Sequence, residues 1–278
     1  MRLNIVPART GMRWVREGVR VFFRMPLAFA GLFFMFLAAT VVLSMVPVAG
    51  DVLALALVPA ATVGLMAATR QAAEGRFPMP ATLLAAFRQS PRQTRAMLVL
   101  GVLYAGALLL IMAVAAWMDG GQLSQLVARH GDRIGPELMA DPDMQQAARA
   151  SMLQMLVSSL LYLPVSVLMW HAPALVHWHG MPVGKSLFFS AVGVLRNGPA
   201  YLVYGLGWMA VASIAWAALL AVAGLAGNLG LALSGLFPLG IVIASMFYAS
   251  LWFTFRDSFT DDAPPPENLD PKEPPALS

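Results

Sequence analysis

The chain contains no cysteine, which excludes disulfides, thiolate metal sites and a cysteine nucleophile. Charged residues are scarce as well, at 12% of 278 residues, whereas a soluble domain carries about a quarter. They are bunched, so long stretches carry no charge, and 59% of the chain is hydrophobic. Because about 20 apolar residues span the hydrocarbon core of a bilayer, this composition predicts an integral membrane protein. An alternating strand pattern is also missing, which favours helices over a barrel.

Six apolar runs predict transmembrane helices, at residues 26–48, 52–70, 95–117, 153–172, 199–224 and 230–255. The expected fold is an all-α integral membrane protein. The first run, from Met25 to Ala49, is longer than the about 7–15 residues of a signal-peptide core, so we expect an uncleaved first span. Residues 1–24 then form a basic amphipathic interfacial helix, and residues 25–256 form a six-helix membrane domain with an outer loop at 118–152. Pro142 suits the first position of a helix that continues into the fourth span.

The last segment, residues 257–278, is acidic and proline-rich and has almost no large apolar side chains. Such a composition predicts a disordered tail. A solvated end without a role and a segment that binds a partner are both compatible with it.

The distribution of Lys and Arg predicts the orientation. Basic residues gather in the N-terminal segment, in residues 70–95, in residues 172–198 and in the tail, while the opposite side carries Arg129, Arg133 and Arg149 among five acids. We therefore expect a multi-pass protein of the bacterial inner membrane with both termini in the cytoplasm.

An arginine followed closely by a proline precedes every outward-going span. The pairs are Arg24 and Pro26, Arg88 and Pro91, and Arg196 and Pro199. Proline is tolerated in the first turn of a helix and pushes the preceding residue out of helical geometry, so each pair marks a break before a span. The arginine is then expected at the level of the lipid headgroups.

Each returning span carries one proline inside its apolar run: Pro59, Pro164 and Pro238. These prolines are expected to kink the helices. Short segments that begin at Met79-Pro80 and Met181-Pro182 predict two further interfacial helices. Together these features predict three pseudo-repeats, each an interfacial helix followed by a hairpin of two spans. Chance matching of short patterns is the alternative.

Arginines recur at helical spacing in the N-terminal segment and form one stripe: Arg9, Arg13, Arg16, Arg20 and Arg24. With Arg88 and Arg196 at the later junctions, they are predicted to contact anionic lipids. The alternative is that they only enforce topology. We expect no nucleic-acid partner, because the stripe lies next to a membrane span.

Small residues spaced by four predict close helix packing, at Ala56, Ala60, Gly64 and Ala68 in span two and at Ser213, Ala217 and Ala221 in span five. Packing within the molecule and a homo-oligomer contact are both open.

The sequence predicts no catalytic, cofactor-binding or metal-binding residue. Ionisable residues at mid-membrane depth, which usually mark ion paths or proton relays, are missing from the predicted spans. The clustered candidates for a metal are His171, His177 and His179. No carboxylate stands among them, so we interpret them as interfacial residues at headgroup level.

The segment "APALVHWHGMPVGKSLFFSAVGVLRNGPAYLVYG" resembles a family of bacterial six-helix inner-membrane proteins. This family is similar in organisation to the membrane domain that accompanies some glycerophosphodiester phosphodiesterases. The resemblance rests on Pro173, Leu175, Val176, Gly180, Ser190 and Asn197 and covers about a quarter of the chain. The phosphodiesterase catalytic domain has no counterpart here. The resemblance implies a six-helix membrane protein without established chemistry.

The expected function is therefore that of a non-enzymatic inner-membrane protein, such as a lipid-associated or envelope-associated scaffold. The alternative is a transporter or channel for a small neutral or lipid-like solute, in which the three prolines free backbone carbonyls around a shared cavity. A membrane enzyme that uses the histidines is the third hypothesis.

Overall fold

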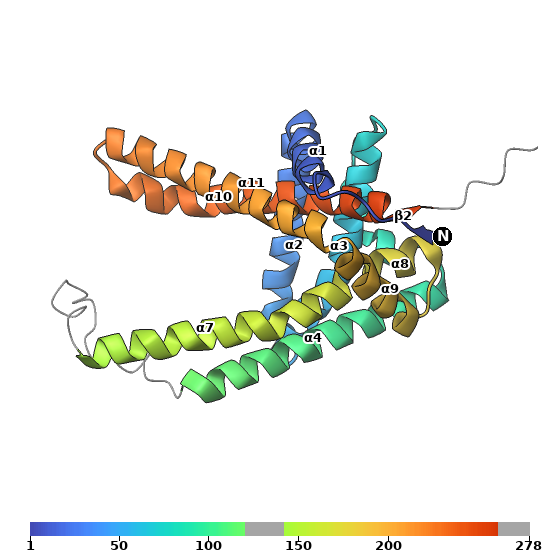
Figure 1. Ribbon diagram of the computed structural model, residues 1–278, viewed down its shortest axis with the longest axis horizontal. Helices are drawn as coiled ribbons and strands as arrows, with labels where there is room; N and C mark the ends of the chain where they lie inside the picture. Colours follow the sequence, from blue (N-terminus) through green and yellow to red (C-terminus); the bar gives the residue numbers. More distant parts are fainter. Residues whose placement is uncertain (120–141, 261–278) are drawn as a thin grey trace, which may run out of the picture.

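The structure is a computed structural model that describes residues 1–119 and 142–260. It is built almost entirely of helices (Figure 1). Six of them are long and apolar enough to cross a membrane: α2 (Pro26–Ser44), α3 (Gly50–Ala73), α4 (Pro91–Asp119), α7 (Pro142–Met169), α10 (Gly198–Leu225) and α11 (Leu229–Ser258). They match the six predicted spans, and the all-α membrane fold is confirmed. The middle of the outer loop and the tail from residue 261 lie outside the described residues.

Short helices precede three of the long ones, as the sequence predicts. They are α1 (Thr10–Arg24) before α2, the 3₁₀ helix η1 (Pro80–Phe87) before α4, and α9 (Val183–Arg196) before α10. The break between α1 and α2 falls at Met25, whose φ of −142° is not helical. Pro26, Pro91 and Pro199 each stand in the first turn of a long helix. An eight-residue segment between α7 and α9 forms a further helix, α8 (Ala172–His179), which was not predicted from the sequence.

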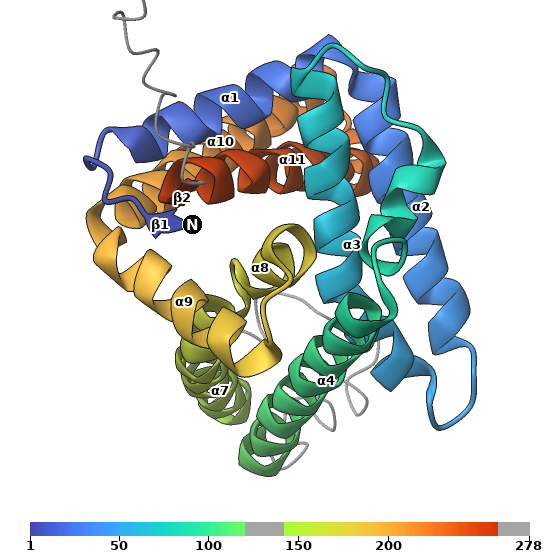
Figure 2. The same cartoon turned by 90° about the vertical axis from the view of Figure 1, so that its right-hand side faces the viewer.

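The three hairpins do not share one direction. Helices α4 and α7 lie side by side, and so do α10 and α11, and both pairs run roughly horizontally in Figure 1. The α2–α3 hairpin runs across them, as Figure 2 shows from the side. Helix α3 contacts α2, α4, α8, α11 and η1, so it connects the first hairpin to one helix of each of the other two. The order of elements repeats along the chain, while the direction of the first hairpin differs from that of the other two.

Small residues on α3 allow its neighbours to approach closely. A Cβ on Gly64 would lie 2.6 Å from the Cα of Leu83, so the backbone of η1 rests directly on α3. A Cβ on Gly101 of α4 would collide with the carbonyl oxygen of Ala56. This small-residue stripe therefore packs within the molecule. The stripe of Ser213, Ala217 and Ala221 on α10 is exposed, and a homo-oligomer contact there stays a prediction.

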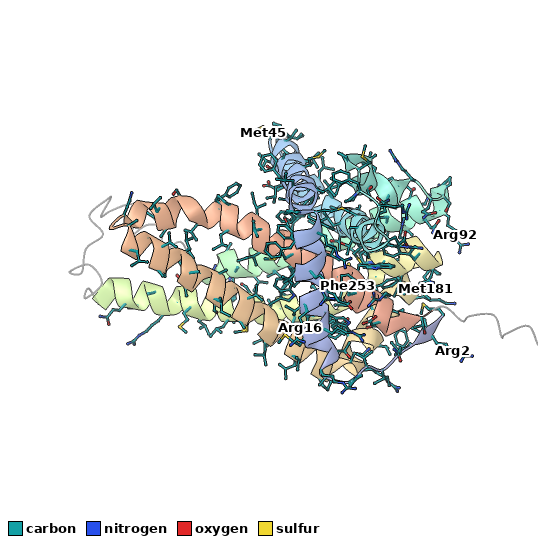
Figure 3. The ribbon with its side chains drawn as sticks, turned by 90° about the horizontal axis from the view of Figure 1, so that it is seen from above. Arg2, Arg16, Met45, Arg92, Met181 and Phe253 are labelled. Carbon is teal, nitrogen blue, oxygen red and sulfur yellow. The ribbon has the colours of Figure 1, made fainter. Side chains whose placement is uncertain are left out.

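The two ends of the described chain meet at one end of the molecule. The strand β1 (Arg2–Leu3) pairs antiparallel with β2 (Phe259–Thr260), which follows α11 directly. Figure 3 places Arg2, Arg92 and Met181 at this same end, opposite the tips of α10 and α11. We call it the terminal end. Because the β1–β2 pairing joins the start of the chain to the end of α11, the first and last described residues lie on the same side of the fold.

Candidate lipid-contact surfaces

The arginine stripe of α1 lies on the exposed face of that helix. All five residues of the stripe are exposed: Arg9, Arg13, Arg16, Arg20 and Arg24. The opposite face is buried and consists of Thr10, Gly11, Trp14, Val15, Gly18, Val21 and Phe22. This alternation at a spacing of three and four residues is that of an amphipathic helix. The apolar face contacts α10 and α11 rather than lipid, so the protein itself fixes the direction in which the arginines point.

Two glycines allow α1 to lie directly on its neighbours. A Cβ on Gly11 would lie 2.7 Å from the backbone nitrogen of Tyr204 in α10. A Cβ on Gly18 would lie 2.5 Å from the Cβ of Ser250 in α11. Glycine is therefore required at both positions for this approach, and any side chain there would push α1 away.

Asp257, near the end of α11, ties α1 to the last long helix. Its Oδ2 atom accepts hydrogen bonds from Arg13, at 2.5 Å, and from the buried indole of Trp14, at 2.9 Å. Its Oδ1 atom accepts one from Arg256, which also reaches Glu17 at 3.0 Å. Charge-assisted bonds of this kind are about twice as strong as neutral ones. Asp257 was not predicted as an anchor, because the sequence places it at the start of the tail predicted to be disordered.

The six residues that carry the family resemblance hold the region between α7 and α10 together. Ser190 is fully buried, accepts from the backbone nitrogen of His171 and donates to the carbonyl of Val167. Asn197 is 1% exposed; it accepts from the backbone nitrogen of Val6 and donates to the carbonyl of Asn4.

The other four residues belong to α8 or end it. Gly180 ends α8 with a φ of +61°, a left-handed conformation that favours glycine. Pro173, Leu175 and Val176 are buried in α8. All six residues therefore act in packing and hydrogen bonding within the protein.

Two of the three histidines that the sequence predicts at the interface are buried inside the protein, and their depth in the membrane stays a prediction. His171 is fully buried, and its Nε2 atom lies 2.5 Å from the hydroxyl of Tyr201. His177 is 6% exposed and packs edge-on against Trp178. The cause is α8, which packs against α3, α4 and α9 and is therefore covered by protein. Within residues 1–119 and 142–260, no group of three His, Asp or Glu side chains is placed to hold a metal ion.

The three prolines of the returning spans do not surround one cavity within the described part of the chain. Each stands inside a continuous helix. Pro59 is buried, whereas Pro164 and Pro238 are exposed. Pro59 lines a cavity of about 300 Å³ whose walls come from α3, α4, α7, α8 and α11. Its lining is mainly apolar, with hydroxyl groups from Tyr104, Tyr162 and Tyr248.

The two junction arginines outside α1 lie in different surroundings. Both are exposed, Arg196 at the end of α9 and Arg88 directly after η1. Arg88 also lines a pocket of about 530 Å³ between α3, η1 and α8. We call it the basic pocket, because Arg70 and Arg76 line it as well. It was not predicted, since it combines residues that are more than 80 positions apart.

Comparison with known proteins adds a relative to this description. A protein of Burkholderia thailandensis named a probable inner membrane protein is 39% identical over 261 residues, which are 93% of this chain and 94% of that protein. No family model matches the chain. No solved structure matches it. The identity extends over nearly the whole length of both chains, and six helices are long and apolar enough to span a membrane. The chain therefore belongs to the family of this probable inner membrane protein and is a multi-pass protein of the inner membrane.

Proposed function

We propose that this is a non-enzymatic, lipid-associated scaffold of the inner membrane that presents a fixed basic surface to anionic lipid headgroups. The observation that supports this most is the arginine stripe on the exposed face of α1, whose other face is buried on α10 and α11. A free amphipathic helix would turn its apolar face into the lipid. Here that face is occupied by protein, so the arginines remain available to headgroups.

The electrostatics support the same proposal. Arg9, Arg16, Arg20 and Arg24 have no ion-pair partner within the described residues. A basic side chain near an anionic membrane surface contributes about 1 kcal/mol of attraction. The positive-inside distribution of the basic residues supports an orientation in which the terminal end of the molecule is cytoplasmic. The resemblance to the membrane domain associated with glycerophosphodiester phosphodiesterases remains a prediction, and it agrees with a lipid-related role.

The experiment is to measure lipid selectivity in proteoliposomes with spin-labelled phosphatidylglycerol and phosphatidylcholine. The wild-type protein should associate with phosphatidylglycerol several-fold more strongly. The quadruple variant Arg9→Gln, Arg16→Gln, Arg20→Gln and Arg24→Gln should lose most of this preference, because these side chains carry unpaired charge. Arg13 is left unchanged, since it bonds Asp257 and its loss would disturb the fold. Equal selectivity of the wild type and the variant would refute the proposed role of the stripe.

A second candidate is a transporter or channel for a small neutral or lipid-like solute. The supporting observation is the apolar cavity of about 300 Å³ beside Pro59, with its three tyrosine hydroxyls. Ligand cavities of this kind combine an apolar lining with a few polar groups. Solute uptake into proteoliposomes tests it, with Ser166→Trp as the variant that fills the cavity. Uptake that the variant does not reduce would count against a path through this cavity.

A further inference from the structure

The helix η1 separates two pockets of opposite character. On one side lies the basic pocket of about 530 Å³. On the other lies an apolar groove of about 380 Å³ between α2, α3 and η1. Ala81 of η1 lines both. The two spaces therefore adjoin one another at the first turn of η1.

The basic pocket has an excess of positive charge. Arg70, Arg76 and Arg88 line it. Glu74 bonds Arg76 and Arg70, and these hydrogen bonds hold the pKa of Glu74 below its ordinary value, so this carboxylate is ionised at neutral pH. Arg88 has no partner within the described residues. Of the three guanidinium groups that line the pocket, two pair with Glu74, and Arg88 is free to bind an anion.

Aromatic side chains hold part of this pocket in place. The guanidinium carbon of Arg70 lies 5.6 Å from the ring centroid of Trp252. Trp178 lines the pocket and packs at a tilt against Trp252, with 5.0 Å between the ring centroids. A guanidinium over an aromatic face is stabilised by cation–π attraction. Arginine also matches the geometry of phosphate oxygens with paired N–H donors.

The apolar groove has the dimensions and the lining that suit a hydrocarbon chain. Its walls are Met35, Phe36, Leu57, Leu83, Leu84 and Phe87. Phe36 is buried at the back of the groove, while Leu84 is 51% exposed. An exposed leucine beside a groove of this kind favours an apolar occupant.

We propose that the two spaces together bind one anionic phospholipid, with its phosphate in the basic pocket and an acyl chain in the apolar groove across Ala81. The positive charge of the arginines favours the negatively charged phosphate. The apolar groove next to it favours a lipid, whose acyl chain fills the groove, over a soluble phosphate ester. Basic pockets between membrane helices are known sites for acidic lipid headgroups. The inference rests on the proposed lipid association and deepens it, but the site is built from α2, α3, η1, α8 and the segments next to them and uses none of the α1 stripe.

Gly64 positions this site. A Cβ on Gly64 would come within 2.6 Å of Leu83, which lies in η1 and lines the groove. The close approach of η1 to α3 therefore determines the width of the groove. A side chain at position 64 would displace η1 and alter both spaces at once.

The test is native mass spectrometry of the full-length protein in detergent, with short-chain phosphatidylglycerol, short-chain phosphatidylcholine or inorganic phosphate added. The wild type should retain about one phosphatidylglycerol, and inorganic phosphate should not displace it at millimolar concentration. Arg88→Gln should weaken retention about tenfold through the headgroup. Ala39→Trp should weaken it through the groove, which Ala39 lines.

The matched controls are Arg92→Gln and Ala38→Trp, which change exposed neighbours outside either lining. Both should retain the lipid as the wild type does. Equal retention of phosphatidylcholine, full displacement by inorganic phosphate, or loss in the controls equal to that in Arg88→Gln would each overturn the proposal. The quadruple α1 variant should retain this bound lipid while losing the preference for phosphatidylglycerol in proteoliposomes. The failure of the proposed lipid site can therefore be distinguished from the failure of the proposed function.

Discussion

Gly18 of α1 and Ser250 of α11 lie against each other so closely that a Cβ on Gly18 would be 2.5 Å from the Cβ of Ser250. This contact holds a helix with five exposed arginines directly against α11. Ser250 is itself held, because its Oγ lies 2.6 Å from the hydroxyl of the buried Tyr204 in α10. The three helices α1, α10 and α11 therefore form one packed unit.

Replacing Gly18 by leucine should separate α1 from α11. The added side chain meets backbone and the Cβ of Ser250, which cannot yield as the end of a flexible side chain would. Overpacking of this kind costs about 1–3 kcal/mol. Thermal unfolding in detergent should shift to lower temperature, and a protease should cut residues before α1 more readily.

The control for this change is Gly31→Leu. Gly31 lies on α2, where a Cβ would meet nothing within 4 Å. An unchanged midpoint for Gly31→Leu with a lower one for Gly18→Leu supports the close contact. Equal midpoints for the two variants would contradict it.

Asp257→Asn should destabilise the same unit. The carboxylate serves Arg13, Trp14 and Arg256, and an amide presents a single acceptor oxygen in its place. Leaving a buried donor without an acceptor costs about 1–3 kcal/mol. Chemical denaturation monitored by tryptophan fluorescence measures the loss. Arg16→Gln, on the exposed face one turn further along, should be neutral, and a loss in Arg16→Gln as large as in Asp257→Asn would argue against a specific anchor.

Asn197→Ala should release the N-terminal segment. The side chain bonds both Val6 and Asn4, and it is 1% exposed, so water does not replace it readily. Amide hydrogen exchange at residues 2–6 should become at least tenfold faster, which corresponds to about 1.4 kcal/mol of lost protection. Exchange in α10 beyond its first turn should stay as in the wild type. Unchanged exchange at Val6 would show that the β1–β2 pairing alone holds the segment.

Gly64→Val should close or distort the groove beside η1. Retention of short-chain phosphatidylglycerol should fall, because Leu83 must move away from α3. Gly106→Val on α4 is the control, since a Cβ there meets nothing within 4 Å. Full retention of lipid in Gly64→Val would mean that the site does not depend on the position of η1.

Local sequence patterns predicted the helices well. The break at Met25 followed from the arginine and proline on either side of it, and the start of α7 at Pro142 followed from the preference of proline for a first turn. Such signals act within a few residues, so they can be read without knowledge of the fold. The exposed position of the α1 arginines followed from helical spacing in the same way.

Tertiary contacts account for what the sequence did not predict. The direction of the α2–α3 hairpin depends on Gly64 and Gly101 meeting partners in η1 and α3, which no local pattern reveals. His171 was predicted to be interfacial because it follows an apolar run, yet it lies directly before α8 and is fully buried in the protein. The basic pocket joins Arg88 to Arg70 and Trp178 across three elements. Only the fold brings such residues together.

The most direct measurement of the central claim is the depth of the α1 stripe in the bilayer. Because the chain has no cysteine, Arg20→Cys offers a single position for a nitroxide label in proteoliposomes. Power-saturation electron paramagnetic resonance then compares collisions with oxygen and with a water-soluble nickel complex. The label should lie at the level of the lipid headgroups, accessible to both reagents. A label that reports bulk water, or one buried in the hydrocarbon, would contradict a basic surface held against anionic headgroups.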